Sequence, residues 1–183
     1  LAYIPFSISE INNLEVLDLS KNYIFEIPDM MHKMHQLKHV DLSQNDLKEL
    51  GYAPSLWKNL KTINLKDNPN LNMENAFQGL SYLDQLESVT VNKLSDLPEN
   101  TALLRAKELV FEDCKFKEST VVFPENSQIK SLVFDGCKKT KFNQVLPSIA
   151  TNKKLEELKL IDNNLKRLVI DSIQFPNLKL LDL

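Results

Sequence analysis

The chain has 183 residues and a formal net charge of -3, so a nucleic-acid backbone would meet no general positive surface, and nucleic acid is not expected as a partner. Hydrophobic residues form 43% of the sequence and aromatic residues only 8%, which predicts a core of aliphatic side chains. No run approaches the roughly 18 apolar residues of a membrane span, so none is expected. The three glycines are too few for a glycine-rich phosphate loop.

A nine-residue pattern, L-x-x-L-x-L-x-x-N, recurs from the start of the chain. Its frame begins at Leu14, Leu37, Leu60, Leu86, Ala106, Ile129, Leu155 and Leu178. Apolar residues at the first, fourth and sixth places alternate with polar residues, as in a strand with one buried face. Strands are therefore predicted over 15–19, 38–42, 61–65, 87–91, 107–111, 130–134, 156–160 and 179–183. On their inner face we expect buried side chains at Leu17, Leu42, Ile63, Val89, Leu109, Phe134 and Leu158.

Return segments between the strands complete each unit. Ile4-Pro5 and Ile27-Pro28 open two of them, and proline followed by spaced apolar residues predicts a short helix or 3₁₀ turn. One unit cannot bury its own apolar side, so each unit needs its neighbours.

The blocks at Leu14, Leu37, Leu60 and Leu155 resemble the leucine-rich-repeat superfamily, and the Ile-Pro-x-x-Ile returns resemble the 23-residue units common in its bacterial and intracellular members. The resemblance covers essentially the whole chain. It implies an α/β repeat, namely a right-handed solenoid with a curved parallel sheet on the concave side and short helices, 3₁₀ turns or loops on the convex side. We expect residues 1–183 to form one such domain, of about eight strand units, within a longer repeat array.

The ninth place of the block is expected to carry a ladder of buried amides. Asparagine stands there at Asn22, Asn45, Asn68 and Asn163, whereas the fourth block has Leu94. Leucine cannot hydrogen-bond the loop backbone, which needs partners when buried. The unit lengths also change here, so we expect a local irregularity between residues 73 and 105.

Two cysteines, Cys114 and Cys137, hold the ninth place of the next two blocks. Adjacent parallel units would bring them within about 5 Å, close enough for a disulfide. Cysteine also resembles a familiar substitute for asparagine at this place in the superfamily, and free, buried, inert thiols are the favoured interpretation. The three histidines fall on both the convex return and the strand, so no metal site is expected.

Outward-facing places of the strands can vary without disturbing the core, so they carry the candidate binding site. Val110 and Val133 are expected side by side on the solvent face, with Ile161 diagonally adjacent and acidic residues around them. An apolar centre with a charged rim is typical of docking surfaces, although paired valines also suit a strand for its own sake. The candidate partner-binding residues on the concave surface are Val110, Val133, Ile161, Glu108, Asp135, Glu157 and Lys159.

The predicted function is that of a non-catalytic protein-protein interaction module, a scaffold that presents its concave sheet to a protein partner and uses no cofactor. The alternative is the substrate-recognition segment of a larger enzyme or host-directed effector, with its catalytic domain outside this chain. A carbohydrate site is disfavoured because Trp57, Tyr23 and Tyr82 fall in return segments. A lysine row at the second place of the blocks indicates a solvated edge. No N-x-S/T sequon occurs, which argues against a glycosylated ectodomain.

Overall fold

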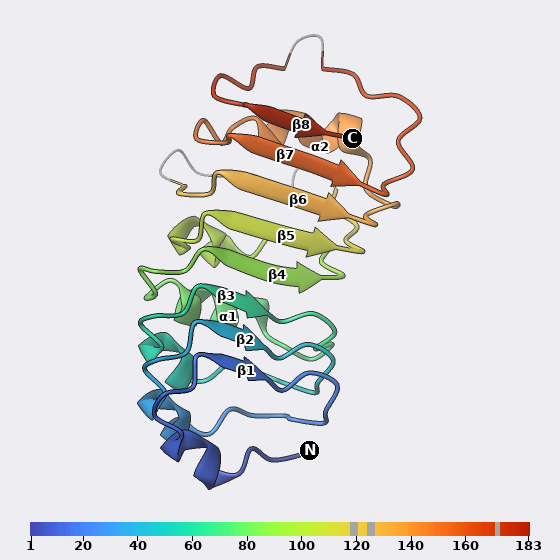
Figure 1. Ribbon diagram of the computed structural model, residues 1–183. Helices are drawn as coiled ribbons and strands as arrows, with labels where there is room; N and C mark the ends of the chain where they lie inside the picture. Colours follow the sequence, from blue (N-terminus) through green and yellow to red (C-terminus); the bar gives the residue numbers. More distant parts are fainter. Residues whose placement is uncertain (118–120, 124–126, 171–172) are drawn as a thin grey trace.

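The computed structural model describes residues 1–117, 121–123, 127–170 and 173–183, and its central feature is one parallel sheet. Eight strands follow one another in sequence order across the sheet (Figure 1). They are β1 (Val16–Asp18), β2 (His39–Asp41), β3 (Thr62–Asn64), β4 (Ser88–Asn92), β5 (Glu108–Glu112), β6 (Ser131–Asp135), β7 (Glu157–Ile161) and β8 (Leu180–Asp182). The predicted parallel solenoid is confirmed, and each strand starts one residue later than predicted.

Strand register preserves the repeat from end to end. Val110 pairs with Val133, and Val133 with Lys159, so the fifth places of three successive blocks form one row. The same alignment holds between β3 and β4, where Ser88 lies opposite Thr62 although the unit between them is longer. The extra residues of that unit are therefore accommodated in its return segment, which contains a helix.

Short helices and 3₁₀ turns form the layer behind the sheet, as expected (Figure 1). They are η1 (Phe6–Glu10), η2 (Asp29–Lys33), η3 (Ala53–Leu56), α1 (Met73–Leu80), η4 (Glu99–Leu103) and α2 (Phe142–Ile149). Proline precedes η1, η2 and η4 with extended backbone, because its fixed φ suits entry into a helical turn and its missing N–H is not needed there. Neither α1 nor α2, nor any other described helix, is long and apolar enough to cross a membrane.

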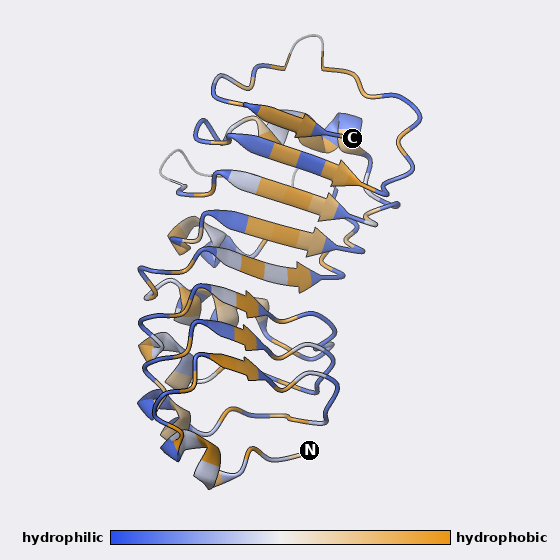
Figure 2. Ribbon diagram, viewed as in Figure 1, coloured by the Kyte–Doolittle hydropathy of each residue, from blue (hydrophilic) through white to orange (hydrophobic). Residues whose placement is uncertain are grey.

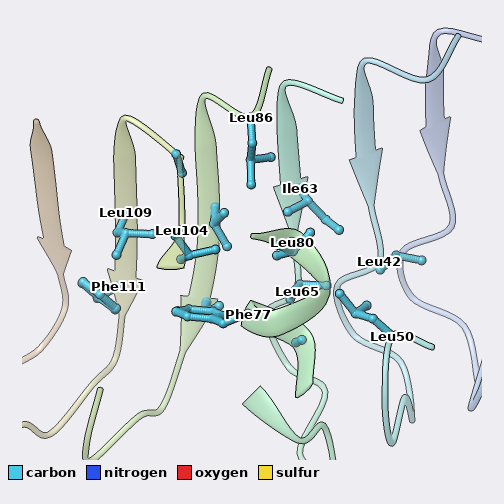
Figure 3. Close-up of a cluster of buried hydrophobic side chains, with 14 of the residues drawn as sticks. Leu42, Leu50, Ile63, Leu65, Phe77, Leu80, Leu86, Leu104, Leu109 and Phe111 are labelled. Carbon is cyan, nitrogen blue, oxygen red and sulfur yellow. The ribbon is translucent and has the colours of Figure 1, made fainter. Parts of the chain in front are cut away.

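The core lies between the sheet and this helical layer. All seven strand residues predicted to be buried are buried. Figure 3 shows Phe77 and Leu80 of α1 among the inward-facing side chains of neighbouring units, including Ile63, Leu65 and Leu104. Further along, the Phe134 ring stacks on Phe111 with a centroid distance of 5.2 Å. The rings of Phe116 and Phe142 contact Phe134 edge-on.

The eighth place of the first seven blocks adopts a left-handed backbone conformation, with φ between 47° and 63°. The residues are Lys21, Gln44, Asp67, Lys93, Asp113, Gly136 and Asp162. Only glycine enters this region without a steric penalty. At Gly136 a β-carbon would also lie 2.9 Å from Oδ1 of Asp113 in the preceding unit. The turn that ends each strand is thus a property of the repeat rather than of a particular side chain.

The buried asparagine ladder forms at three of the four predicted places, whereas Asn22 is half-buried and its amide donates to carbonyls of its own unit. The Asn45 amide donates to the Leu19 carbonyl at 2.9 Å and accepts from the Ile24 N–H at 2.9 Å, both in the preceding unit. Asn68 makes equivalent bonds to its preceding unit. Asn163 donates to the equivalent carbonyl, that of Phe134, but accepts from the N–H of Cys137, two residues before the equivalent position.

In the fourth block, where Leu94 stands at the ninth place, the side chain of Asn92 makes the polar contact to the preceding unit instead. The Asn92 side chain accepts from the Asp67 N–H at 2.9 Å and donates to the Asp67 carboxylate at 2.8 Å. The backbone N–H of Leu94 donates a hydrogen bond to the Cys114 sulfur, at a distance of 3.3 Å. Polar contacts between successive turns therefore continue through residues 73–105.

Candidate functional site

The concave face carries a hydrogen-bonded row of polar side chains at the third place of the strands. The Ser88 hydroxyl donates to Glu108 at 2.9 Å, and the Ser131 hydroxyl donates to the other oxygen of Glu108 at 3.1 Å. Glu157 lies 3.5 Å from the same Ser131 hydroxyl and 3.2 Å from the Lys159 ammonium. Three of the predicted orienting residues, Glu108, Glu157 and Lys159, are therefore brought together and held in fixed positions.

Beside this row lies the predicted apolar patch. Val110 and Val133 are directly opposite each other, and Asp135 pairs with Ile161, so Ile161 is diagonal to Val133 as predicted. The apolar character of β5 and β6 is visible in Figure 2. Ile161 is 40% exposed and Val110 is half-buried.

Val133 lies on the concave face in one row with Val110, but the expectation that it is exposed to solvent there is wrong, because only 9% of it is exposed. Val133 lies on an interior strand, with Val110 on one side and Lys159 on the other. Parallel strands are only about 4.8 Å apart, so the side chains of both neighbours cover it. The accessible apolar surface is therefore that of Val110 and Ile161, and Val133 fills the space between them.

A shallow groove of about 590 Å³ runs along the edge where β3 to β7 begin. Both signs of charge line it, and its charged residues are Glu87, Lys107, Glu108, Lys130, Glu156 and Glu157. The groove adjoins the polar row, because Glu108 and Glu157 belong to both. The concave face thus offers a small apolar area next to a shallow groove that is lined by both signs of charge.

Four of the five lysines in the predicted row at the second place pair with acidic residues of neighbouring units. Lys38 contacts Glu15 at 2.7 Å, and Lys61 contacts Glu87 at 3.4 Å. Lys130 and Lys179 both contact Glu156, at 2.7 Å and 2.6 Å. Their hydrogen bonds lower the pKa of the Glu156 carboxyl to about 2. These exposed pairs set the electrostatics of the groove edge and contribute little to stability.

Cys114 and Cys137 occupy the ladder as free, buried thiols. The Cys114 N–H donates to the Cys137 sulfur at 3.2 Å, and the Cys137 thiol lies 3.5 Å from the Phe111 carbonyl. Each sulfur thus takes the structural place of an asparagine amide. The hydrogen bond with Cys137, together with burial, raises the pKa of the Cys114 thiol, so Cys114 is neutral and unreactive at neutral pH.

We expect neither cysteine to react with an alkylating reagent in the native protein, because both thiols are buried. Both should be labelled after unfolding without a reductant, and mass measurement would show two added groups. Labelling of both thiols in the native state would contradict the burial of the pair. Labelling of neither after unfolding would show a disulfide instead.

The histidines have separate environments. The His32 ring contacts the Asp29 carbonyl within η2, whereas the His39 ring contacts the Thr62 hydroxyl across the sheet. In the described ranges no group of three or more His, Cys, Asp or Glu side chains is arranged to hold a metal ion.

A cluster of cations at the other edge of the sheet was not anticipated from the sequence. It follows β5, β6 and β7 and consists of Lys115, Lys117, Lys138, Lys139, Lys141, Lys166 and Arg167, all exposed. We call these seven residues the basic flank. The signal was present in the sequence as Lys138-Lys139 and Lys166-Arg167, which occur at similar places in consecutive units.

A stacked parallel sheet with an asparagine ladder and an open concave face defines a solenoid repeat protein. The family model described as "Leucine rich repeat" matches residues 5–47. A disease resistance protein of Arabidopsis thaliana, RFL1, is 31% identical over 97 residues, which are 53% of this chain and 11% of that protein. The chain therefore spans about a tenth of the length of this relative. Residues 5–47 therefore match the leucine-rich-repeat family, and the whole chain has the leucine-rich-repeat fold.

Three solved structures have a similar fold and support the assignment of the leucine-rich-repeat fold. A leucine-rich-repeat protein of Leptospira interrogans is similar over 100% of this chain and 52% of its own, with a TM-score of 0.59 and 21% identity. Internalin C2 of Listeria monocytogenes matches 96% of this chain and 74% of its own, with a TM-score of 0.54 and 19% identity. The leucine-rich-repeat domain of the type III effector XopL matches 98% and 72%, with a TM-score of 0.57 and 18% identity.

Proposed function

We propose that this chain binds a protein partner through the concave face of its fifth to seventh units. The leucine-rich-repeat fold generally serves as a protein-interaction module. The observation that carries the proposal is the apolar surface of Val110 and Ile161 beside the charged groove. An apolar anchor surrounded by polar groups is the usual composition of a binding hot spot.

The rim residues give the proposed surface its specificity. Glu108, Glu157 and Lys159 are already held by Ser88 and Ser131 or by each other. Because their positions are fixed before binding, less side-chain entropy is lost on association. Asp135 lies opposite Glu112 and Ile161 in the strand register and adds negative charge at the far side of the patch. Such a surface favours a partner with an apolar side chain flanked by basic groups.

The test is a Val110→Glu, Ile161→Glu double variant compared with the native protein in quantitative pull-downs and then in titrations with the retained partner. We expect the affinity to fall by about 2 kcal/mol, which is roughly 30-fold. Val133 is left unchanged because its burial would confuse loss of binding with loss of folding.

The matched control is Val122→Glu, since Val122 is 56% exposed and lies in a return segment. This control should bind like the native protein, and both variants should have native melting curves. Equal binding by the double variant and the control would place the interface elsewhere on the molecule.

A further inference from the structure

Charge is segregated along the edge where the strands end. The return segments after the first four strands (23–29, 46–52, 69–75 and 95–99) carry one cation, Lys48, and seven carboxylates. These are Glu26, Asp29, Asp46, Glu49, Glu74, Asp96 and Glu99. Segments 115–117, 138–144 and 164–170, which follow the next three strands, hold the basic flank, and the first of them is followed directly by Glu118. Although the net charge is -3, the described residues of these three units therefore form a strongly positive region.

Four of the seven cations have no ion pair among the described residues, whereas Lys138 pairs with Asp162 at 2.8 Å. For Lys139, Lys141, Lys166 and Arg167 the described part of the chain provides no ion pair. Like charges gathered on one surface repel one another. An anion that contacts several of them at once relieves this repulsion and gains several attractive contacts, so it is bound more strongly than by a single exposed ion pair.

The basic flank contains a groove. A depression of about 470 Å³ lies between the return segments after β6 and β7, and four of the seven cations line it. Lys138 and Lys141 stand on one side, and Lys166 and Arg167 on the other. An extended segment lying in this groove would meet cations on both sides, and the Arg167 guanidinium can bind a carboxylate with two hydrogen bonds.

Side-chain bonds between successive units fix the spacing of the three basic segments. The Asn143 amide donates to the Arg167 carbonyl at 3.2 Å and accepts from the Val169 N–H at 2.9 Å. The Thr140 hydroxyl donates to the Cys114 carbonyl and accepts from the Phe116 N–H, both at 3.1 Å. The backbone that carries the cations is therefore preorganised, which lowers the entropic cost of binding a multivalent anion.

We propose that the basic flank is a second docking surface, separate from the concave face, and that it binds an acidic protein segment rich in Asp and Glu. A segment of this kind can be confined to three units. A flat anionic membrane or a long nucleic acid would extend over the neighbouring acidic segments and be repelled by their seven carboxylates. The charge pattern thus favours a short acidic segment over either alternative.

The experiment uses the 183-residue chain and a fluorescein-labelled deca-glutamate peptide, measured by fluorescence anisotropy at low salt and at about 150 mM salt. We expect saturable binding that weakens as salt rises. A Lys141→Glu, Arg167→Glu double variant should bind at least about tenfold more weakly, since two attractive contacts become repulsive. The matched control is Lys153→Glu, Lys154→Glu, which changes the net charge equally on exposed residues outside the basic flank.

The control should bind the peptide within about twofold of the native protein, and melting curves should show that both variants are folded. Equal weakening by the control would show an effect of net charge alone and overturn the proposal. So would tighter binding to phosphatidylserine vesicles or to single-stranded DNA than to the peptide. The Val110→Glu, Ile161→Glu variant should bind the peptide normally, which separates this proposal from the one for the concave face.

Discussion

Replacing Phe134 with alanine is expected to lower the free energy of unfolding by about 4 kcal/mol, the usual scale for removing a buried aromatic ring. Phe134 is fully buried, and its ring contacts Phe111, Phe116 and Phe142. These rings come from three different segments, so the cavity left by alanine cannot close by moving one side chain. Urea denaturation followed by circular dichroism measures the loss.

The matched substitution is Phe134→Leu, which keeps most of the volume and should cost about 1 kcal/mol. A difference between the two variants of less than about 1 kcal/mol would mean that the surrounding rings relax into the cavity. The prediction bears on function because both proposed surfaces lie on units that pack against Phe134. Binding assays on any variant here therefore need a stability measurement beside them.

Replacing Asn45 with alanine should cost about 3 kcal/mol, because the change leaves a buried N–H of Ile24 without a partner and removes one of the two side-chain amides that donate to the Leu19 carbonyl. Both partners belong to the unit before Asn45, so the contact between adjacent units is weakened rather than one turn alone. The shift of the urea midpoint at an unchanged slope measures this cost.

The control is Asn70→Ala, an exposed asparagine in the loop after β3, which should change stability by no more than about 0.5 kcal/mol. Similar effects of the two substitutions would mean that the ladder is not a major contribution to stability. A large change in the slope for the Asn45 variant would instead indicate that the units no longer unfold together.

The sequence was sufficient for the fold because spacing determines the structure of a repeat protein. Inward places such as Leu42 and Ile63 must be apolar in each unit, so the period shows the strands and the core together. The ladder at Asn45 could be predicted for the same reason. In each case the contact recurs once in every unit, so the period of the sequence is enough to predict it.

Contacts specific to one place could not be read from the period. The burial of Val133 depends on how far the side chains of Val110 and Lys159 extend over it, which alternation of apolar and polar residues does not encode. The replacement of the ladder by Asn92 depends on the loop at Asp67. The basic flank could have been found by aligning the return segments as well as the strands, since only that comparison brings Lys138, Lys141 and Arg167 together.

The residue with left-handed backbone conformation after each strand limits which repeat units can replace one another, whether by duplication in evolution or by design. A unit ending in Lys21 or Gln44 accepts the turn with a side chain present. At Gly136 a transplanted side chain would press on the Asp113 carboxylate of the unit before it, which would then have to rotate away. Recombining these repeats is therefore a question of neighbours as well as of length, and the sixth unit is compatible with its neighbours only when its turn residue is matched to the unit that precedes it.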